Sequence, residues 1–316
     1  TYTDLFTSAV LATIMFGVGL SIHPFDLKDI FRSPRAFYVG LFTQMIILPV
    51  MAFLITFFTD LPPAIKTGFI ILAASPGGTT SGFITVLFRG NVALSVALTT
   101  INSVMTLFTI PLIVNLALTI YFGRHSVFEL PFIESFLQIF FVTLLPAGTG
   151  VLIRYRWDRF ADRIQKPVRT TMIILFAAVY TFIFLADESS GGSGITMNEV
   201  ASILPYAMAV NIAALAAGII AGRMAKTGIK SSFTISIEVA VHNTTLALLV
   251  AGTLIQQNDM IKPALVYAMF SFWTAVLFGY FVKRQQKLPV FGEFRDGSKQ
   301  LTTNSEQLRI CLIICY

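Results

Sequence analysis

The chain has 316 residues, of which 55% are hydrophobic and only 12% are charged, and its mean hydropathy is +0.78. An ordinary soluble domain carries about 25% charged residues, so these values exclude a typical cytosolic enzyme, a disordered chain and a collagen-like fibre. They indicate a polytopic membrane protein. The net charge of +6 does not indicate nucleic-acid binding, because the basic residues lie between apolar runs and not in one patch interleaved with aromatic residues.

The two ends of the chain carry little functional information. Both cysteines, Cys311 and Cys315, lie close to the C-terminus, which excludes a disulfide framework or a cysteine-ligated metal site in the core. The chain begins with Thr1, so we expect residues to precede it in the complete protein. Residues 5–20 have neither a basic segment before them nor a small-residue cleavage site, so we interpret them as a retained membrane helix and not as a signal peptide.

Nine apolar segments have the length of a membrane-spanning helix, which is about 20 residues. In chain order they cover residues 4–22, 35–58, 64–88, 91–122, 131–153, 168–186, 200–222, 233–256 and 263–282. No soluble domain separates them. We expect the polar residues 285–316 to form a disordered cytoplasmic tail, in part of cloning origin.

The basic residues are distributed unequally between the two sides of the predicted membrane. Sixteen of the 22 fall in loops on one side, and only Lys66, Arg124 and Lys262 fall on the other. Because basic loops face the cytoplasm, we expect the N-terminus outside and the C-terminus in the cytoplasm. This predicts a multi-pass protein of a bacterial inner membrane or a plasma membrane, with an odd number of spans.

The third predicted span contains a sequence that an ordinary helix does not tolerate, ASPGGTTSG at residues 74–82. Pro76 removes a backbone donor, and Gly77 and Gly78 each weaken a helix by about 1 kcal/mol relative to alanine. We therefore predict a helix break at mid-membrane, which is tolerated only where protein or water lines it. A simple proline kink packed by small residues is the alternative.

The eighth predicted span contains a buried carboxylate, Glu238, followed by His242, Asn243, Thr244 and Thr245. Burying an ionised carboxylate is costly unless it is paired or binds a cation. Two alternatives remain open: a protonated Glu238 that serves as structural glue, or a misplaced span with Glu238 at the membrane surface. Paired interruptions in the two halves of a chain indicate a transporter site, in which half-helix N-termini face an anion and unwound carbonyls face a cation.

The fourth predicted span carries polar residues three or four positions apart, which places them on one helix face. They are Asn91, Ser95, Thr99, Asn102, Ser103 and Thr106. Hydroxyl and carbonyl oxygens suit a hard alkali cation, although Ser/Thr packing between helices gives the same pattern. Gln44, followed by Pro49 in the second span, is by itself a weak indication of a site.

In combination and order, these motifs resemble the bile acid:sodium symporter family (solute carrier family 10 and its bacterial relatives). The resemblance rests on SPGGT at 75–79, RGNVALS at 89–95 and IEV at 237–239, supported by FGVGL at 16–20 and by Gln44 with Pro49. The resemblance covers residues 11–282, and the chain looks like a bacterial member of the family. Family members couple sodium entry to the uptake of organic anions such as bile acids, sulfated steroids or small carboxylates.

The resemblance implies an all-α inverted-repeat transporter in which a panel domain rocks against a core with two crossing broken helices. The implied panel comprises residues 1–34 and 131–199, and the implied core repeats are residues 35–130 and 200–284, followed by the tail 285–316. Some bacterial members have ten spans, and this chain lacks the first of them or begins after it.

The resemblance also carries three sets of binding residues onto this chain. One sodium site falls on Ser81, Ser95, Thr99 and Glu238. The other falls on Gln44, Glu238 and His242, with Val239 and Val241 contributing backbone carbonyls. Substrate contacts fall near Thr79, Thr80, Asn243 and Thr244, at the two helix breaks.

Two positions depart from the family pattern. Gly82 stands where the family usually has Asn, so one side-chain oxygen is lost. His242 stands where the family usually has Gln, and a neutral histidine offers one nitrogen acceptor, a poor ligand for sodium. Because histidine also titrates near neutral pH, a single sodium ion, proton coupling or uncoupled transport are alternatives to two sodium ions.

The sequence thus predicts a secondary active transporter of a small organic anion, with sodium as coupling ion and no other cofactor. A channel would carry a continuous polar stripe in several spans. An enzyme is not expected, because the three histidines lie far apart and no HExxH pair is present. A receptor is disfavoured because no soluble domain is evident. We expect a lipid bilayer around the chain and no nucleic-acid or obligate protein partner.

Overall fold

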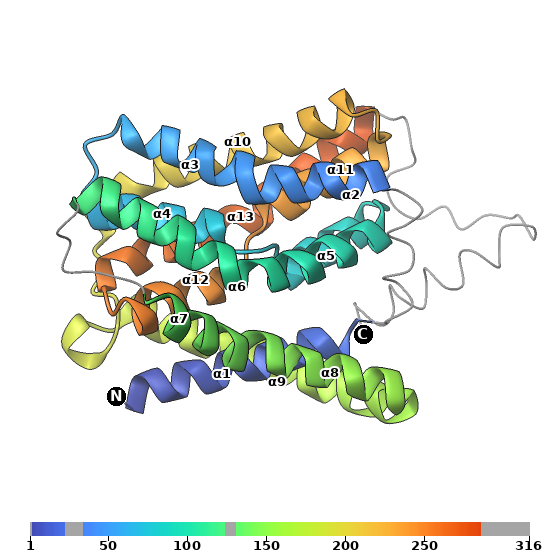
Figure 1. Ribbon diagram of the computed structural model, residues 1–316, viewed down its shortest axis with the longest axis horizontal. Helices are drawn as coiled ribbons and strands as arrows, with labels where there is room; N and C mark the ends of the chain where they lie inside the picture. Colours follow the sequence, from blue (N-terminus) through green and yellow to red (C-terminus); the bar gives the residue numbers. More distant parts are fainter. Residues whose placement is uncertain (1, 23–33, 124–130, 286–316) are drawn as a thin grey trace, which may run out of the picture.

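The computed structural model describes residues 2–22, 34–123 and 131–285. Over these residues every regular element is a helix, and the only β-type pairing is one isolated bridge (Figure 1). Arg124 and the tail beyond Gln285, which contains Cys311 and Cys315, lie outside the described residues.

The helices follow the predicted order, with short π-helical or 3-10 turns between some of them. They are α1 (Tyr2–Leu20), α2 (Pro34–Phe42), η2 (Thr43–Ile47), α3 (Leu48–Phe57), α4 (Pro63–Ala74), α5 (Thr79–Leu87), α6 (Val92–Phe122), α7 (Phe132–Ile139), η3 (Phe140–Leu144), α8 (Leu145–Arg156), α9 (Asp158–Leu185), η4 (Glu188–Ser190), α10 (Met197–Met224), α11 (Ile229–Ala240), α12 (Thr244–Leu249), η5 (Val250–Leu254) and α13 (Asn258–Gln285). The π-helical turns η2, η3 and η5 continue their neighbours, so α2 to α3, α7 to α8, and α12 with η5 are continuous rods.

Six helices, with continuous helices counted as one, are long and apolar enough to cross a membrane in the described chain. They are Pro34–Phe57, Val92–Phe122, Phe132–Arg156, Asp158–Leu185, Met197–Met224 and Asn258–Arg284. Three shorter apolar helices are also present in the described chain, Ser8–Leu20, Pro63–Ala74 and Thr244–Leu254. The prediction of an all-helical polytopic membrane protein is confirmed over these residues. The count of nine crossings stays a prediction.

The helices form two groups that lie one above the other in Figure 1. One group contains α1, α7, α8 and α9, and the other contains α2 to α6 and α10 to α13. Within the first group α1 and α8 touch through glycine: a Cβ on Gly19 would lie 1.9 Å from the carbonyl oxygen of Ala147. Only a residue without a side chain permits this approach, which is common between membrane helices.

A buried arginine on α8 joins the ends of α1, α8 and α9. The guanidinium of Arg154 donates to the carbonyl of Leu20 (2.8 Å), to Asp158 (3.0 Å), to Asp162 (2.5 Å) and to the side chain of Gln165 (2.7 Å). Arginine suits this position because its planar group satisfies several acceptors at once. α1, α8 and α9 are therefore tied together at one end of their group.

The basic segment around residues 154–169 is helical, which corrects the predicted loop. α9 begins at Asp158 and not at Val168, and only Trp157 separates it from α8. The acidic Asp158 in its first turn complements the positive end of the helix dipole. Buried Ala161 and Gln165 give this extension an inward face, a contact that the polar sequence did not reveal.

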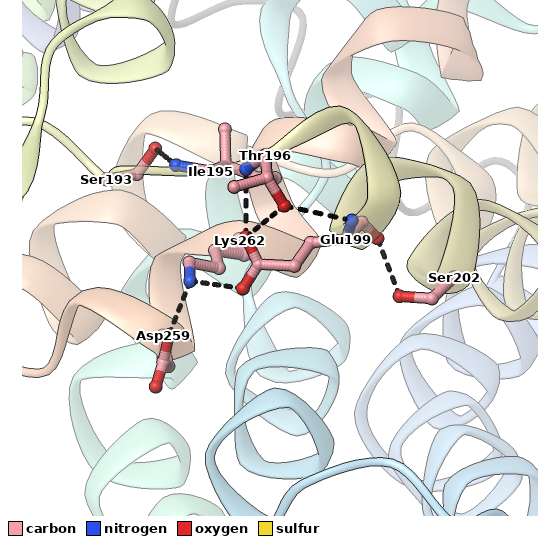
Figure 2. A network of polar contacts seen from close by, with 7 residues as sticks. All are labelled: Ser193, Ile195, Thr196, Glu199, Ser202, Asp259 and Lys262. Carbon is pink, nitrogen blue, oxygen red and sulfur yellow. Dashed lines mark hydrogen bonds and ion pairs between the residues drawn. The ribbon is translucent and has the colours of Figure 1, made fainter.

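A second polar network joins α10 to α13 (Figure 2). Lys262 of α13 is 4% exposed, and its Nζ lies 2.6 Å from Glu199 and 2.6 Å from Asp259. Glu199 also accepts the backbone N–H of Thr196 at 2.8 Å, and its own N–H donates to the Thr196 hydroxyl, which completes a capping box at the start of α10. The same carboxylate thus caps the N-terminus of α10 and pairs with a lysine on α13.

Replacing Lys262 by Met should destabilise the protein by about 1–3 kcal/mol, because it leaves two adjacent carboxylates without their shared cation. The matched variant Glu199→Gln should cost less, since glutamine keeps the capping box and Asp259 still pairs with Lys262. The measurement is the thermal unfolding of both variants in detergent. Equal losses, or a larger loss in Glu199→Gln, would contradict this account of the network.

Candidate ion-binding site at the crossing of two interrupted helices

The two predicted helix breaks exist, and they meet. α4 ends at Ala74 and α5 begins at Thr79, whereas α11 ends at Ala240 and α12 begins at Thr244. The short extended segments between them pair as an antiparallel bridge: the N–H of Gly78 donates to the carbonyl of Val241 (2.9 Å), and the N–H of Asn243 donates to that of Pro76 (2.8 Å). Each interrupted segment thus provides hydrogen-bond partners for backbone groups of the other that lie outside helices.

Glycine is required at one point of this crossing. A Cβ on Gly77 would lie 2.3 Å from Oε2 of Glu238, a distance that no side chain could adopt without displacing the carboxylate. The sequence signal of Pro76 followed by two glycines therefore has two causes. Pro76 ends hydrogen bonding along the helix, and Gly77 admits the Glu238 carboxylate against the backbone.

Glu238 lies in the last turn of α11 and is fully buried. Its carboxylate accepts hydrogen bonds from the hydroxyls of Ser81 (2.8 Å), Ser95 and Thr99 (2.8 Å). None of the ion pairs found among the described residues includes it. Because it is fully buried, Glu238 is shielded from water by the protein itself, and its depth in the membrane stays a prediction. A cation or a proton is needed to balance its charge, because three neutral donors do not remove it.

The four residues of the first predicted sodium set are thus brought together from three segments: α5, α6 and α11. The remainder of the polar stripe on α6 behaves differently. Ser103 donates to the carbonyl of Thr99 and Thr106 to that of Ser103, and Asn91 caps α6 by accepting the N–H of Leu94. Ser95 and Thr99 of this stripe therefore belong to the candidate site, whereas Asn91, Ser103 and Thr106 form hydrogen bonds within or at the end of their own helix.

Two residues of the second predicted set, Gln44 and His242, lie near the backbone of Ser75. Gln44, on the π-helical turn η2, donates from Nε2 to that carbonyl at 3.2 Å. Pro49 lies just after η2 and lacks the N–H that would bond one turn back, which favours a widened turn here. The backbone of Ser75 also interacts with the ring of His242.

Several buried polar atoms of this set have no partner in the described chain. Among the described residues, Oε1 of Gln44 and both ring nitrogens of His242 are buried without a hydrogen bond of ordinary geometry. The carbonyl of Val241 already accepts the N–H of Gly78. Buried polar atoms are nearly always bonded, so these atoms are candidates for binding a ligand.

The predicted substrate residues lie at the starts of α5 and α12, and one of them, Asn243, contacts the other helix group. Asn243 caps α12 by accepting the N–H of Leu246 (3.1 Å), and its Nδ2 lies 3.9 Å from the sulfur of Met15 in α1. Thr80 and Thr244 are half-buried at the starts of α5 and α12. A small apolar cavity of about 10 Å³ is lined by α1, α9 and α12, with Ile14, Phe176 and Thr245 among its residues.

Sequence reasoning missed the residues that anchor the end of α11. The carbonyl of Ala240 accepts from Asn211 (3.2 Å) and from the hydroxyl of Tyr267 (2.7 Å), and Thr274 donates to Asn211 (2.7 Å). This cluster fixes the last turn that carries Glu238. Asn211, an isolated amide in an apolar span, is the one signal that could have revealed it.

Comparison with known proteins decides the family. The sequence model of the Sodium Bile acid symporter family matches residues 8–190. The chain belongs to this family. The predicted resemblance is therefore confirmed, and the match includes the first break with Ser81, Ser95 and Thr99.

Relatives of this symporter-family chain occur in bacteria, plants and animals. It is 26% identical over 287 residues to the uncharacterized sodium-dependent transporter YocS of Bacillus subtilis, with 91% of this chain and 86% of the relative covered. It is 29% identical over 254 residues to the "Probable sodium/metabolite cotransporter BASS1, chloroplastic" of Arabidopsis thaliana (79% and 59%). It is 26% identical over 199 residues to the human sodium-dependent organic anion transporter (63% and 52%). The chain thus spans only about half the length of the plant and human proteins.

Proposed function

We propose that this chain is a secondary active transporter that couples sodium entry to the uptake of an organic anion by alternating access. The observation that carries the proposal is Glu238, a buried carboxylate with three hydroxyls around it and no cationic side chain paired to it in the described chain. Hydroxyl and carboxylate oxygens are the ligands that hard cations prefer. Sodium-dependent relatives support the same conclusion.

The proposed ion ligands are the two sets named above. Ser81, Ser95, Thr99 and Glu238 form the first, and Gln44, Glu238, Val239, Val241 and His242 form the second. Both sets use Glu238, which packs against the backbone of Gly77. Ion binding at Glu238 would therefore affect the conformation of the helix crossing. Sodium bound there would stabilise the packing of α5, α6 and α11, on which the substrate residues Thr79, Thr80, Asn243 and Thr244 depend.

The proposed substrate is a small organic anion at the start of α5 and α12. The partial positive charge of helix N-termini and the side chains of Asn243 and Thr244 would hold its acidic group. The apolar residues of α1, α9 and α12 that line the small cavity there would contact its hydrocarbon part when the two helix groups move apart. The human relative named for organic anions supports this class of substrate.

For alternating access, the group of α1, α7, α8 and α9 acts as the panel and the other group as the core, in the residue ranges expected from sequence. The Arg154 cluster would let the panel move as one body. By the distribution of basic residues, the N-terminus lies outside and the C-terminus in the cytoplasm.

Uptake into proteoliposomes tests this function. A bile acid, a steroid sulfate and a small carboxylate would be offered with an inward sodium gradient, and with choline in place of sodium. We expect at least one anion to accumulate above its external concentration only with the sodium gradient. Equal uptake in choline would refute sodium coupling, and equilibration without accumulation would indicate a channel.

Proton coupling is the second candidate, and His242 is the observation that favours it. Both of its nitrogens are buried without a hydrogen bond of ordinary geometry in the described chain, and an imidazole can bind and release a proton. Accumulation driven by a pH gradient without sodium would establish this alternative in place of the first.

Gly82 offers a way to strengthen the first ion site. A Cβ there would meet only Ser95 Oγ, at 3.8 Å, which is an ordinary contact. Gly82→Asn should therefore fold, and its added amide oxygen should lower the half-saturating sodium concentration by about threefold to tenfold. The matched variant Gly82→Leu has similar size without the oxygen. If both variants bind sodium alike in a thermal-shift titration, the missing oxygen is irrelevant.

A further inference from the structure

Asn102 is a buried amide on the polar face of α6 that belongs to neither of the two sets of ion-binding residues. It lies in the middle of α6, is 1% exposed, and within the described chain neither Oδ1 nor Nδ2 has a hydrogen-bond partner. Buried amides in native proteins are almost always bonded, so one with both atoms unpartnered calls for an explanation. Exchanging the positions of Oδ1 and Nδ2 would still leave both atoms of the amide without a partner in the described chain.

The helical position of Asn102 directs it toward the crossing. It follows Ser95 by seven residues and Thr99 by three, so it shares a helix face with the two α6 hydroxyls that donate to Glu238. It lies one turn farther along α6 than Thr99. The next polar residues on this face, Ser103 and Thr106, are satisfied by carbonyls of their own helix.

α6 packs against α2 and against η2, the turn that carries Gln44. α2 and α6 touch where a Cβ on Gly40 would come within 2.6 Å of Leu98. The two helices run in the same direction, because the chain returns between them through α4 and α5 (Figure 1). One turn onward from this contact stand Gln44 on one helix and Asn102 on the other. Gln44 is held by Ser75 through Nε2, and its Oε1 is buried without a partner in the described chain.

We propose that Asn102 is a cation ligand, whose amide oxygen and Gln44 Oε1 hold an alkali cation beside the helix crossing. Amide oxygens suit a hard cation. A water molecule on that cation would accept the hydrogen bond of the Asn102 amide nitrogen, so that one partly hydrated ion satisfies all three unpartnered atoms. The inference rests on the proposed sodium coupling and adds to it a ligand outside both sets of ion-binding residues.

The test uses the purified full chain in detergent, with sodium chloride titrated against choline chloride at constant ionic strength. The reporter is the unfolding midpoint, which rises with any ion that binds the folded state. In Asn102→Leu, which has nearly the same volume without the amide, we expect the half-saturating sodium concentration to rise about tenfold or more. The control Thr106→Val, on the same face, should stay within about twofold of the wild type.

Two outcomes would overturn the inference, and they are distinguishable. If the wild type shows a sodium shift that Asn102→Leu retains at the same half-saturation, Asn102 is an orphan amide and the proposed function stands. If the wild type shows no sodium shift, sodium coupling and this inference fail together. Should Asn102→Leu not fold, Asn102→Ser is titrated in its place, and an unchanged half-saturation there overturns the inference equally.

Discussion

Glu238→Gln is expected to lower sodium affinity at least about 100-fold while the protein still folds. The substitution keeps the shape of the side chain but removes the negative charge, and loss of a charged ligand in a desolvated site costs several kcal/mol. The hydroxyls of Ser81, Ser95 and Thr99, which donate to the carboxylate, can rotate to suit an amide. Sodium-dependent thermal shift and proteoliposome uptake measure the effect.

The control for this variant is Glu134→Gln, which changes the same residue type at an exposed position on α7. It should leave sodium dependence unchanged. If Glu238→Gln fails to fold, the alternative of a protonated carboxyl that serves as structural glue gains support. A folded Glu238→Gln protein with the sodium affinity of the wild type would remove Glu238 from the ion site.

Gly77→Ala is expected to destabilise the protein by about 1–3 kcal/mol, the usual effect of overpacking a filled interior, and to abolish sodium-dependent uptake. The added methyl group would lie 2.3 Å from Glu238 Oε2 and 3.3 Å from the Glu238 carbonyl oxygen. It would therefore displace the carboxylate from the position in which the three hydroxyls hold it. Thermal unfolding and uptake of the same preparation separate the loss of stability from the loss of function.

Gly148→Ala is the matched control, because a Cβ on Gly148 in α8 has no neighbour within 4 Å. Alanine there should be neutral or stabilise the helix by up to about 1 kcal/mol. Should Gly77→Ala unfold and transport as Gly148→Ala does, the contact between Gly77 and Glu238 would not have the importance given to it here.

The central part of the candidate site could be predicted from sequence because its signals are local. Pro76 with two glycines breaks a helix wherever it occurs, and a carboxylate in an apolar span must have partners. The grouping of Ser81, Ser95 and Thr99 around Glu238 came from the family resemblance, and the structure brings these residues together. Their role as sodium ligands stays a prediction.

Other features depend on tertiary contacts that leave little trace in sequence. The cavity beside Thr245 is lined by apolar residues of α1 and α9, which in sequence are indistinguishable from lipid-facing ones. The start of α9 at Asp158 depends on packing of its first turns against neighbouring helices. The pairing of Lys262 with Glu199 joins residues far apart in the chain, and the sequence assigned that lysine only a place in a loop.

The most direct test of the central claim is the thermal stability of the purified wild-type protein in sodium, potassium and choline chloride over a range of pH. A ligand that binds only the folded state raises the unfolding midpoint with its concentration. We predict a shift that is specific to sodium and that Glu238→Gln removes. Equal midpoints in all three salts, or a midpoint that follows pH alone, would contradict a sodium site at the helix crossing.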